Sequence, residues 1–293
     1  MTKRWKCLVN KINKMTLFEV YKDSIKQLKN PDVGEINVRI LLCEINSLNS
    51  MSEFYLKKDE DIRDLQKFYE YFKRFLNGEP VQYILGKTEF LGNEILVDKR
   101  VLIPRQESEE VVTFTANKIK EIFGDKKVDI LDVCCGSGVM GITLSKMTNC
   151  NNLILSDTSN DALCVAKKNL TKNNITATVF CGNALDEIIK NNVKCDVVIA
   201  NPPYILKSEK VDDSVLKYEP SLALFTDEDF SIYRNIIDNL HLIKKNILLA
   251  VFEIGANTRN VIEQFLINKY PDYEFEFKKD MNGKERILYI VIR

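Results

Sequence analysis

From about residue 110 onward, the chain alternates short apolar runs with segments of helical spacing. Short apolar runs are typical of strands buried on both faces, and strands separated by helices form largely parallel sheets. The pattern predicts an α/β, Rossmann-like domain with helices on both faces of its sheet. The predicted strands are 128–133, 152–156, 176–181, 195–200, 247–253, 273–277 and 286–292.

Residues 16–76 show a different pattern, with apolar side chains at helical spacing and few β-branched runs. Asn77-Gly78-Glu79-Pro80 then ends the last helix, because glycine and proline terminate helices. Short β-type runs on both sides of Gly92-Asn93 predict a hairpin. We therefore expect a helical bundle at 1–76, a linker with a β-hairpin at 77–109 and the α/β domain at 110–293.

The charge balance argues against a protein that binds duplex nucleic acid. The 42 basic and 42 acidic residues cancel, whereas such proteins usually carry a basic excess. No apolar run approaches the roughly 20 residues of a membrane span. The 8 cysteines are dispersed without a Cys-x-x-Cys motif, so we expect no metal site and a cytoplasmic location. The basic residues 1–14 could form a solvated helix, an RNA-touching arm or an organelle address.

A glycine-rich segment, DVCCGSGVMG (132–141), follows the first predicted strand. Its three glycines match G-x-G-x-x-G, which lets the backbone turn sharply and approach a ligand at a helix N-terminus. Asp157 ends the second strand, where a carboxylate can accept both ribose hydroxyls of an adenosine or cap the next helix. Asn183 is similarly placed near an adenine edge. The spacing suits either a nicotinamide cofactor or S-adenosylmethionine.

The segment NPPY (201–204), at the end of the fourth strand, favours S-adenosylmethionine. Two prolines form a stiff turn that presents Asn201 and Tyr204, although a plain strand-ending turn could use the same residues. A planar NH2 group is a poor nucleophile because its lone pair is delocalised. The Asn201 side-chain oxygen and the Pro202 carbonyl could hold both of its N–H groups, and Tyr204 could pack on its plane, so that alignment carries the catalysis. Hydride transfer has no evident use for this corner.

These motifs resemble the PrmC/HemK methyltransferases, which N5-methylate a glutamine in peptide chain release factors. NPPY is shared with adenine-N6 and some guanine-N2 methyltransferases, whereas GEPVQYILG followed by LIPR is far more specific to this family. The resemblance extends over nearly the whole chain. Its matching segments are GEPVQYILGKTEF (78–90), VLIPRQESEEVV (101–112), LDVCCGSG, Asp157, NPPYI, YEPSLAL (218–224) and NGKER (282–286).

The resemblance implies a seven-stranded domain that transfers methyl from S-adenosyl-L-methionine, leaving S-adenosyl-L-homocysteine. The acceptor would be the glutamine of a Gly-Gly-Gln motif in a release factor, docked partly on residues 1–76 by a monomeric enzyme. Catalysis would rest on Asn201, Pro202 and Tyr204. Pro203, Arg105 and Glu109 would also bind substrate. The implied cofactor site comprises Cys134, Cys135, Gly136, Ser137, Gly138, Asp157, Asn183, Ala184 and Asn201.

Two departures from the family pattern stand out. QESE (106–109) replaces the usual Pro-Asp-Thr-Glu after LIPR, and Cys134 stands where glycine is common, so its side chain could narrow the cofactor loop. Arg105 and Glu109 could equally form a charge pair at a helix start. Three alternatives stay open: a ribosomal-protein glutamine methyltransferase, a nucleic-acid amino methyltransferase and a cofactor-binding module without catalysis. Zero net charge disfavours the second, and the intact Asn201 disfavours the third.

Overall fold

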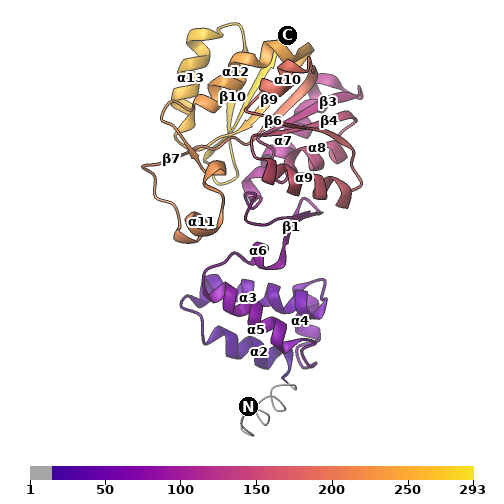
Figure 1. Ribbon diagram of the computed structural model, residues 1–293, viewed down its shortest axis with the longest axis vertical. Coiled ribbons are helices and arrows are strands. Elements are labelled where there is room, and N and C mark those ends of the chain that lie inside the picture. The colour runs from indigo at the N-terminus through magenta and orange to yellow at the C-terminus, as the bar shows by residue number, and fades with distance from the viewer. Residues whose placement is uncertain (1–14) are drawn as a thin grey trace. The chain divides into compact units, whose positions relative to one another are not determined.

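The computed structural model describes residues 15–293 of the chain. The protein divides into two compact units, Met1–Gly86 and Lys87–Arg293 (Figure 1). The basic residues 1–14, for which the sequence left three interpretations open, lie outside the described residues. Within residues 15–293, no helix is both long and apolar enough to cross a membrane.

The N-terminal unit is a bundle of helices around an aromatic and aliphatic core. Phe54, Phe68 and Phe72 are almost fully buried, and the last two stack with ring centroids 5.7 Å apart. Thr16 and Asp64 each cap a helix by accepting a backbone N–H. The helices are α2 (Leu17–Ile25), α3 (Pro31–Asn46), α4 (Met51–Leu56), α5 (Leu65–Leu76) and α6 (Val81–Leu85).

Helix α6 extends this unit past Leu76, where the sequence predicts the linker to begin. Val81 and Ile84 of α6 belong to the same buried cluster as Phe68. Helices α4 and α6 span 6 and 5 residues. Elements this short show no clear hydrophobic period, so the sequence predicts neither of them.

A β-hairpin opens the second unit, around Gly92. Strands β1 (Lys87–Phe90) and β2 (Asn93–Leu96) pair antiparallel, with Phe90 opposite Asn93. Leu91 and Gly92 have φ angles of 45° and 75°, and a type I′ turn requires positive φ at both central residues. Leucine is unusual in that conformation, and its N–H donates to the Glu109 carboxylate at 3.0 Å.

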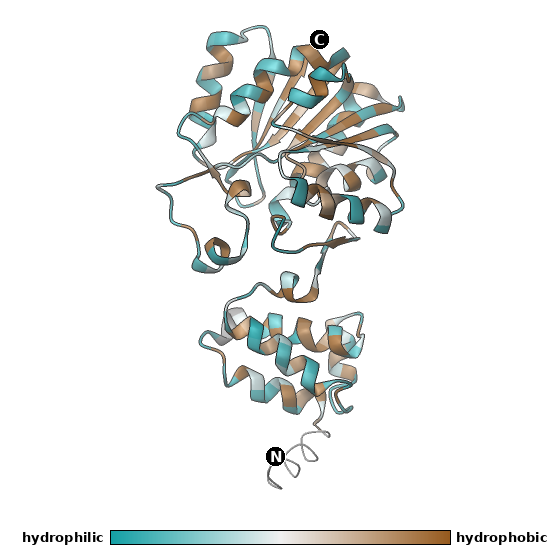
Figure 2. Cartoon of the chain, viewed as in Figure 1, coloured by the Kyte–Doolittle hydropathy of each residue, from teal (hydrophilic) through white to brown (hydrophobic). Residues whose placement is uncertain are grey.

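The second unit is built on a 7-stranded sheet, which confirms the predicted α/β fold. The central strands β3 and β6 have the predicted limits and are buried along nearly their whole length. The strands of this sheet consist largely of hydrophobic residues, coloured brown in Figure 2. Strand β11 is antiparallel to both neighbours, and the other pairs are parallel. The spatial order is β10 (Glu274–Lys279), β11 (Glu285–Ile292), β9 (Lys244–Glu253), β6 (Cys195–Ala200), β3 (Val128–Val133), β4 (Cys150–Asp157) and β5 (Ala177–Cys181).

Helices cover both faces of this sheet (Figure 1). One face carries α7 (Gln106–Phe123), α8 (Val139–Met147) and α9 (Asn160–Lys172), and the other carries α10 (Asp186–Lys190), α12 (Ser231–Ile243) and α13 (Thr258–Lys269). The segment between β6 and α12 holds short elements that the sequence does not predict. They are β7 (Ile205–Leu206), α11 (Asp213–Tyr218), the 3-10 helix η1 (Ser221–Ala223) and β8 (Phe225–Thr226).

The strand register brings four loops to one edge of the sheet. Val133 of β3 pairs with Ser156 of β4 on one side and with Ala200 of β6 on the other. Asp157 of β4 pairs with Cys181 of β5. The loops after β3, β4, β5 and β6 therefore leave the sheet side by side, at the edge where such sheets bind ligands.

Helix α8 approaches strand β3 closely at Gly141. The buried Asp132 carboxylate accepts the Gly141 N–H at 2.8 Å. A Cβ on residue 141 would lie 2.8 Å from the Asp132 Cβ and 2.9 Å from a Leu155 methyl carbon, so the packing fits glycine. Burial raises the pKa of Asp132 to about 7, although the bond from Gly141 acts in the opposite direction.

We expect Gly141→Ala to destabilise the second unit by about 1–3 kcal/mol, the usual cost of overpacking a core. Helix propensity alone would favour alanine by about 1 kcal/mol, so a gain in stability would contradict the packing argument. The measurement is the midpoint of chemical denaturation. Met147→Ala in the same helix is the matched control and should leave the midpoint nearly unchanged, because Met147 is 45% exposed.

Candidate functional site

A cavity of about 890 Å³ opens where the four loops leave the sheet. Its volume lies in the range of small-molecule and cofactor sites, about 300–1,000 Å³. Gly138, Pro202, Tyr204, Arg105 and Glu109 stand outside its lining. The predicted residues that line the cavity are Cys134, Cys135, Gly136, Ser137, Asp157, Asn183, Ala184, Asn201 and Pro203.

The glycine loop forms one wall of the cavity through left-handed backbone conformations. Cys134, Gly136 and Gly138 have φ angles of 58°, 54° and 79°. A side chain in this region costs about 1–2 kcal/mol, so Cys134 occupies a position that favours glycine. Its side chain is half-buried at the cavity wall, and Gly138 turns the chain into α8 behind the lining.

Asp157 holds the glycine loop against the next strand. One carboxylate oxygen accepts the Gly136 N–H and the other accepts the Ser159 N–H, both at 2.8 Å. Burial raises its pKa, and these two bonds oppose the shift. Helix α9 is capped by Ser159 instead, which accepts the Ala162 N–H. Because each carboxylate oxygen can accept a second hydrogen bond, Asp157 can still bind two hydroxyl groups of a ligand.

Asn201 presents an unused amide at the end of β6. Its side chain makes no hydrogen bond with any other described residue of the chain, and it lines the cavity beside Pro203. The preceding residue, Ala200, pairs with Val133 immediately before the glycine loop. An amide left free at this point can bind a polar group that enters the cavity.

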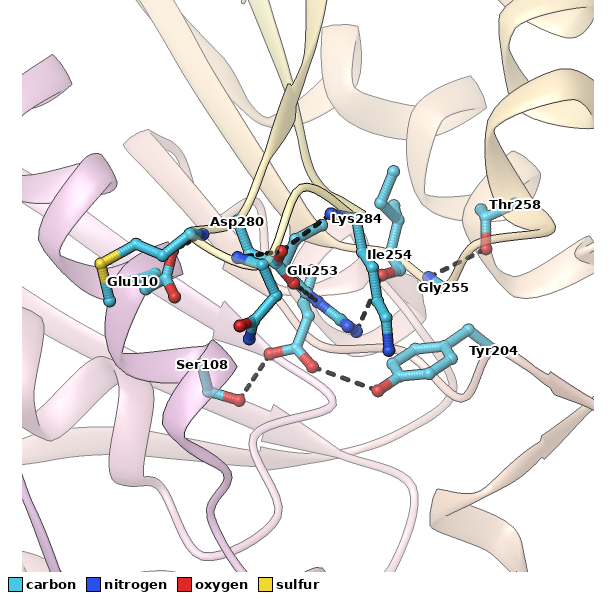
Figure 3. A network of polar contacts seen from close by, with 12 residues as sticks. Ser108, Glu110, Tyr204, Glu253, Ile254, Gly255, Thr258, Asp280 and Lys284 are labelled. Carbon is cyan, nitrogen blue, oxygen red and sulfur yellow. Dashed lines mark hydrogen bonds and ion pairs between the residues drawn. The ribbon is translucent and has the colours of Figure 1, made fainter. Parts of the chain in front are cut away.

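Within the NPPY corner, Pro202 and Tyr204 contact buried residues of the protein and do not line the cavity. The Pro202 carbonyl oxygen is 3.2 Å from the hydroxyl of the buried Tyr233. The Tyr204 hydroxyl points toward the Glu253 carboxylate at 3.4 Å (Figure 3). A Cβ on Gly255 would lie 2.7 Å from the Tyr204 ring, so the ring packs closely on this glycine. In this structure Tyr204 braces the corner from behind.

Arg105 and Glu109 have separate partners. The Arg105 guanidinium donates to the Glu219 carboxylate at 2.5 Å, and the second oxygen of Glu219 accepts the Ile103 N–H at 3.1 Å. This pair ties the LIPR segment to the YEPSLAL segment, and Pro104 from the first lines the cavity. Glu109, expected at the pocket, instead binds the turn of the hairpin through its carboxylate.

Sequence reasoning missed the wall contributed by the segment after the corner. Because these residues belong to irregular chain and short elements, neither hydrophobic period nor a motif distinguishes them. They include Leu206, Lys207, Ser208, Phe225, Asp227 and Glu228. Among residues 15–293 there is also no group of three or more acidic, cysteine or histidine side chains arranged to hold a metal ion.

Two family models match the chain. The PrmC N-terminal domain matches residues 19–86, and the Methyltransferase small domain matches residues 113–218. The first match covers the helices of the N-terminal unit from α2 to α6. The second covers the strands that carry the glycine loop, Asp157 and the NPPY corner.

Curated relatives match over most of their length. The release factor glutamine methyltransferase of Mycoplasma mycoides subsp. mycoides is 40% identical over 72% of this chain and 76% of its own. The corresponding protein of Bacillus subtilis is 33% identical over 78% of this chain and 81% of its own.

A solved structure shares the fold at lower identity. The T. thermophilus 16S rRNA N2 G1207 methyltransferase, in complex with AdoMet and guanosine, superposes with a TM-score of 0.50 at 14% identity. The alignment covers 71% of this chain and 50% of that one. By the identity and coverage of its relatives, the chain belongs to the family of release factor glutamine methyltransferases.

Proposed function

We propose that this protein transfers a methyl group from S-adenosyl-L-methionine to the side-chain amide nitrogen, N5, of the glutamine in the Gly-Gly-Gln motif of peptide chain release factors. The observation that carries this proposal is the free Asn201 amide at a cavity shared with the glycine loop. The register between Val133 and Ala200 places these two features on neighbouring strands. A methyl donor and an amide acceptor can therefore meet in one cavity.

The residues at the glycine loop fit S-adenosyl-L-methionine, which supplies an activated methyl group on a sulfonium. Asp157 keeps acceptor capacity for two ribose hydroxyls, and Asn183 and Ala184, which line the same cavity, would contact the adenine. The stretch from Cys134 to Gly138 lets backbone approach the rest of the cofactor closely. The Cys134 side chain, which lines the cavity, would narrow the space for the cofactor at this loop.

The NPPY corner would hold the acceptor amide. The Asn201 side-chain oxygen and the Pro202 carbonyl oxygen each accept one N–H of the glutamine, so its nitrogen faces the methyl group in a fixed orientation. Well-oriented reactants can lower a barrier by about 7–11 kcal/mol. An N-methylated, protonated amide is a strong acid that loses its proton to water, so no dedicated base is needed. The sole histidine, His241, is exposed on α12, away from the lining.

The N-terminal unit is the proposed docking surface for the release factor. It has its own core of buried side chains, including Leu41 and Phe54, and carries no recognisable catalytic motif. A cavity that admits one glutamine side chain can contact few neighbouring residues of the substrate. Much of the recognition of the intact factor would then come from a surface outside the cavity.

The proposal includes a monomeric enzyme that acts in the cytoplasm without binding nucleic acid directly. Equal numbers of acidic and basic residues, 42 of each, support the last point. The cysteines described by the structure are free thiols, as is usual in a reducing compartment. Light scattering of the purified protein and a nucleic-acid binding assay test the first and third expectations.

We expect Asp157→Ala to raise the Kd for S-adenosyl-L-methionine at least about tenfold, because hydrogen bonds to a charged group contribute about 1.5–3 kcal/mol each. Isothermal titration calorimetry measures this directly. Asp161→Ala is the matched control, since Asp161 is exposed on the adjacent helix α9. Unchanged affinity in Asp157→Ala would refute this cofactor placement, and tight binding of NADH would revive hydride transfer.

Asn201→Ala should lower the single-turnover rate by about 10²-fold or more while the Kd for the cofactor stays nearly unchanged, because Asn201 orients the acceptor. Asn201→Asp is the matched variant. It keeps an acceptor oxygen and should retain more activity than the alanine variant. Rapid-quench assays with labelled methyl donor give the rates. A near-normal rate in Asn201→Ala would mean that NPPY serves here as a turn.

Removing residues 1–86 should reduce methylation of an intact release factor more than methylation of a short Gly-Gly-Gln peptide. The cut follows the end of the first compact unit at Gly86. The ratio of kcat/KM for the two substrates is the measurement, and normal cofactor affinity of the shortened protein is the control for its folding. Equal losses on both substrates, or no loss on the intact factor, would contradict docking by this unit. Labelling of ribosomal protein or nucleic acid in place of release factor would overturn the proposed function.

A further inference from the structure

A buried carboxylate lies directly behind the NPPY corner. Glu253 is the last residue of β9 and is only 1% exposed to solvent. The preceding residue, Phe252, pairs with Ala200 at the end of β6. Glu253 therefore ends its strand beside the strand that leads into Asn201.

Two hydroxyl groups face this carboxylate from different parts of the chain (Figure 3). The Ser108 hydroxyl of α7 donates to one oxygen at 2.5 Å, and the Tyr204 hydroxyl lies 3.4 Å from the other. A carboxylate accepts hydrogen bonds and donates none. When Glu253 is ionised, both hydroxyl groups donate to it, and this contact orients the Tyr204 phenol.

The main chain of Glu253 contacts the same corner by a second route. The Tyr233 hydroxyl donates to the Glu253 carbonyl at 2.8 Å and lies 3.2 Å from the Pro202 carbonyl. A phenol has one proton to donate. Since the shorter contact is to Glu253, the Pro202 carbonyl keeps acceptor capacity for a substrate N–H.

The charges around Glu253 are partly balanced. Burial raises the pKa of Glu253, and the negative charge of Glu107 raises it further. The hydrogen bonds from Ser108 and Tyr204 and the positive charge of Arg286 lower it. Arg286, on β11, is held in place by Asp280 at 3.3 Å and by the Ile254 carbonyl at 3.4 Å. The carboxylate thus sits between a cation and two hydroxyl donors.

We propose that Glu253 is a positioning residue for methyl transfer: its carboxylate holds the Tyr204 phenol and so fixes the shape of the corner that presents Asn201. The inference rests on the proposed function of this corner. Glu253 is buried behind Tyr204 and is not among the residues that line the cavity, so its effect on the acceptor would pass through Tyr204. The contact between Tyr204 and Glu253 cannot be predicted from the NPPY motif, because the two residues are 49 positions apart in the sequence.

The test is a double-mutant cycle with Glu253→Gln, Tyr204→Phe and the combined variant in the full-length protein. Glutamine keeps the size of the side chain but offers one acceptor oxygen in place of two. We expect each single substitution to lower kcat on release factor by about tenfold while KM and cofactor Kd stay nearly unchanged. The combined variant should lose little beyond either single variant, because both substitutions break the same contact.

Several results would overturn the inference. One is a Tyr204→Phe variant, or a folded Glu253→Gln variant, whose kcat equals that of the wild type. Another is a combined variant whose loss in kcat equals the product of the two single losses. A Glu253→Gln protein with reduced cofactor affinity and a lowered unfolding midpoint would indicate a general structural role. If that variant does not fold, Tyr204→Phe still decides, since its hydroxyl contacts Glu253 and no other described hydrogen-bond partner.

The same assay separates this inference from the proposed function. Wild-type protein that methylates no release factor overturns the proposed function and the inference together. Wild-type protein that methylates release factor, with a Glu253→Gln variant that matches it in kcat, overturns the inference alone.

Discussion

The pairing of β3 with β6 is the constraint on which the rest of the site depends. Val133 pairs with Ala200, so the next residue of each strand starts a loop at the same level of the sheet. Neighbouring strands lie about 4.8 Å apart, which sets the separation between the glycine loop and the NPPY corner before any side chain contributes. Both strands are buried, so a slip of one residue would turn every side chain to the wrong face.

The central strands could be predicted because their signals are local. The runs 128–133 and 195–200 are largely apolar. A glycine loop follows the first run, and two prolines follow the second. The limits observed for β3 and β6 are the predicted ones. The order of the strands in the sheet could not be predicted in this way. The pairing of β3 with β6 joins segments more than 60 residues apart, and the hydrophobic periodicity of each strand does not indicate its neighbour.

The environment of each predicted site residue could be anticipated only where its contacts follow from the sheet topology. Asp157 ends β4 and lines the cavity beside the glycine loop, where a strand-end acid lies in this topology. Glu109 is bound by the hairpin turn, a contact that depends on the left-handed Leu91. Arg105 finds its partner, Glu219, 114 positions away. Long-range contacts of this kind need the folded chain, and sequence spacing carries no record of them.

The glycine loop and the NPPY corner each contact a carboxylate that accepts hydrogen bonds: Asp157, which is partly buried, and Glu253, which is buried. Asp157 accepts the backbone N–H groups of Gly136 and Ser159, and Glu253 faces the hydroxyl groups of Ser108 and Tyr204. Leaving a charged group without partners away from water is unfavourable in free energy. The hydrogen bonds to each carboxylate therefore keep the donor groups in fixed positions.

Such rigidity matters for a reaction that depends on orientation. A displacement of about 1 Å can cost about 10²-fold in rate. The stiffness of Pro202 and Pro203 limits the backbone of the corner, while the contacts of Tyr204 and Tyr233 limit its position. Within residues 15–293 the Asn201 side chain has no hydrogen-bond partner, so its amide is available to a polar group that enters the cavity.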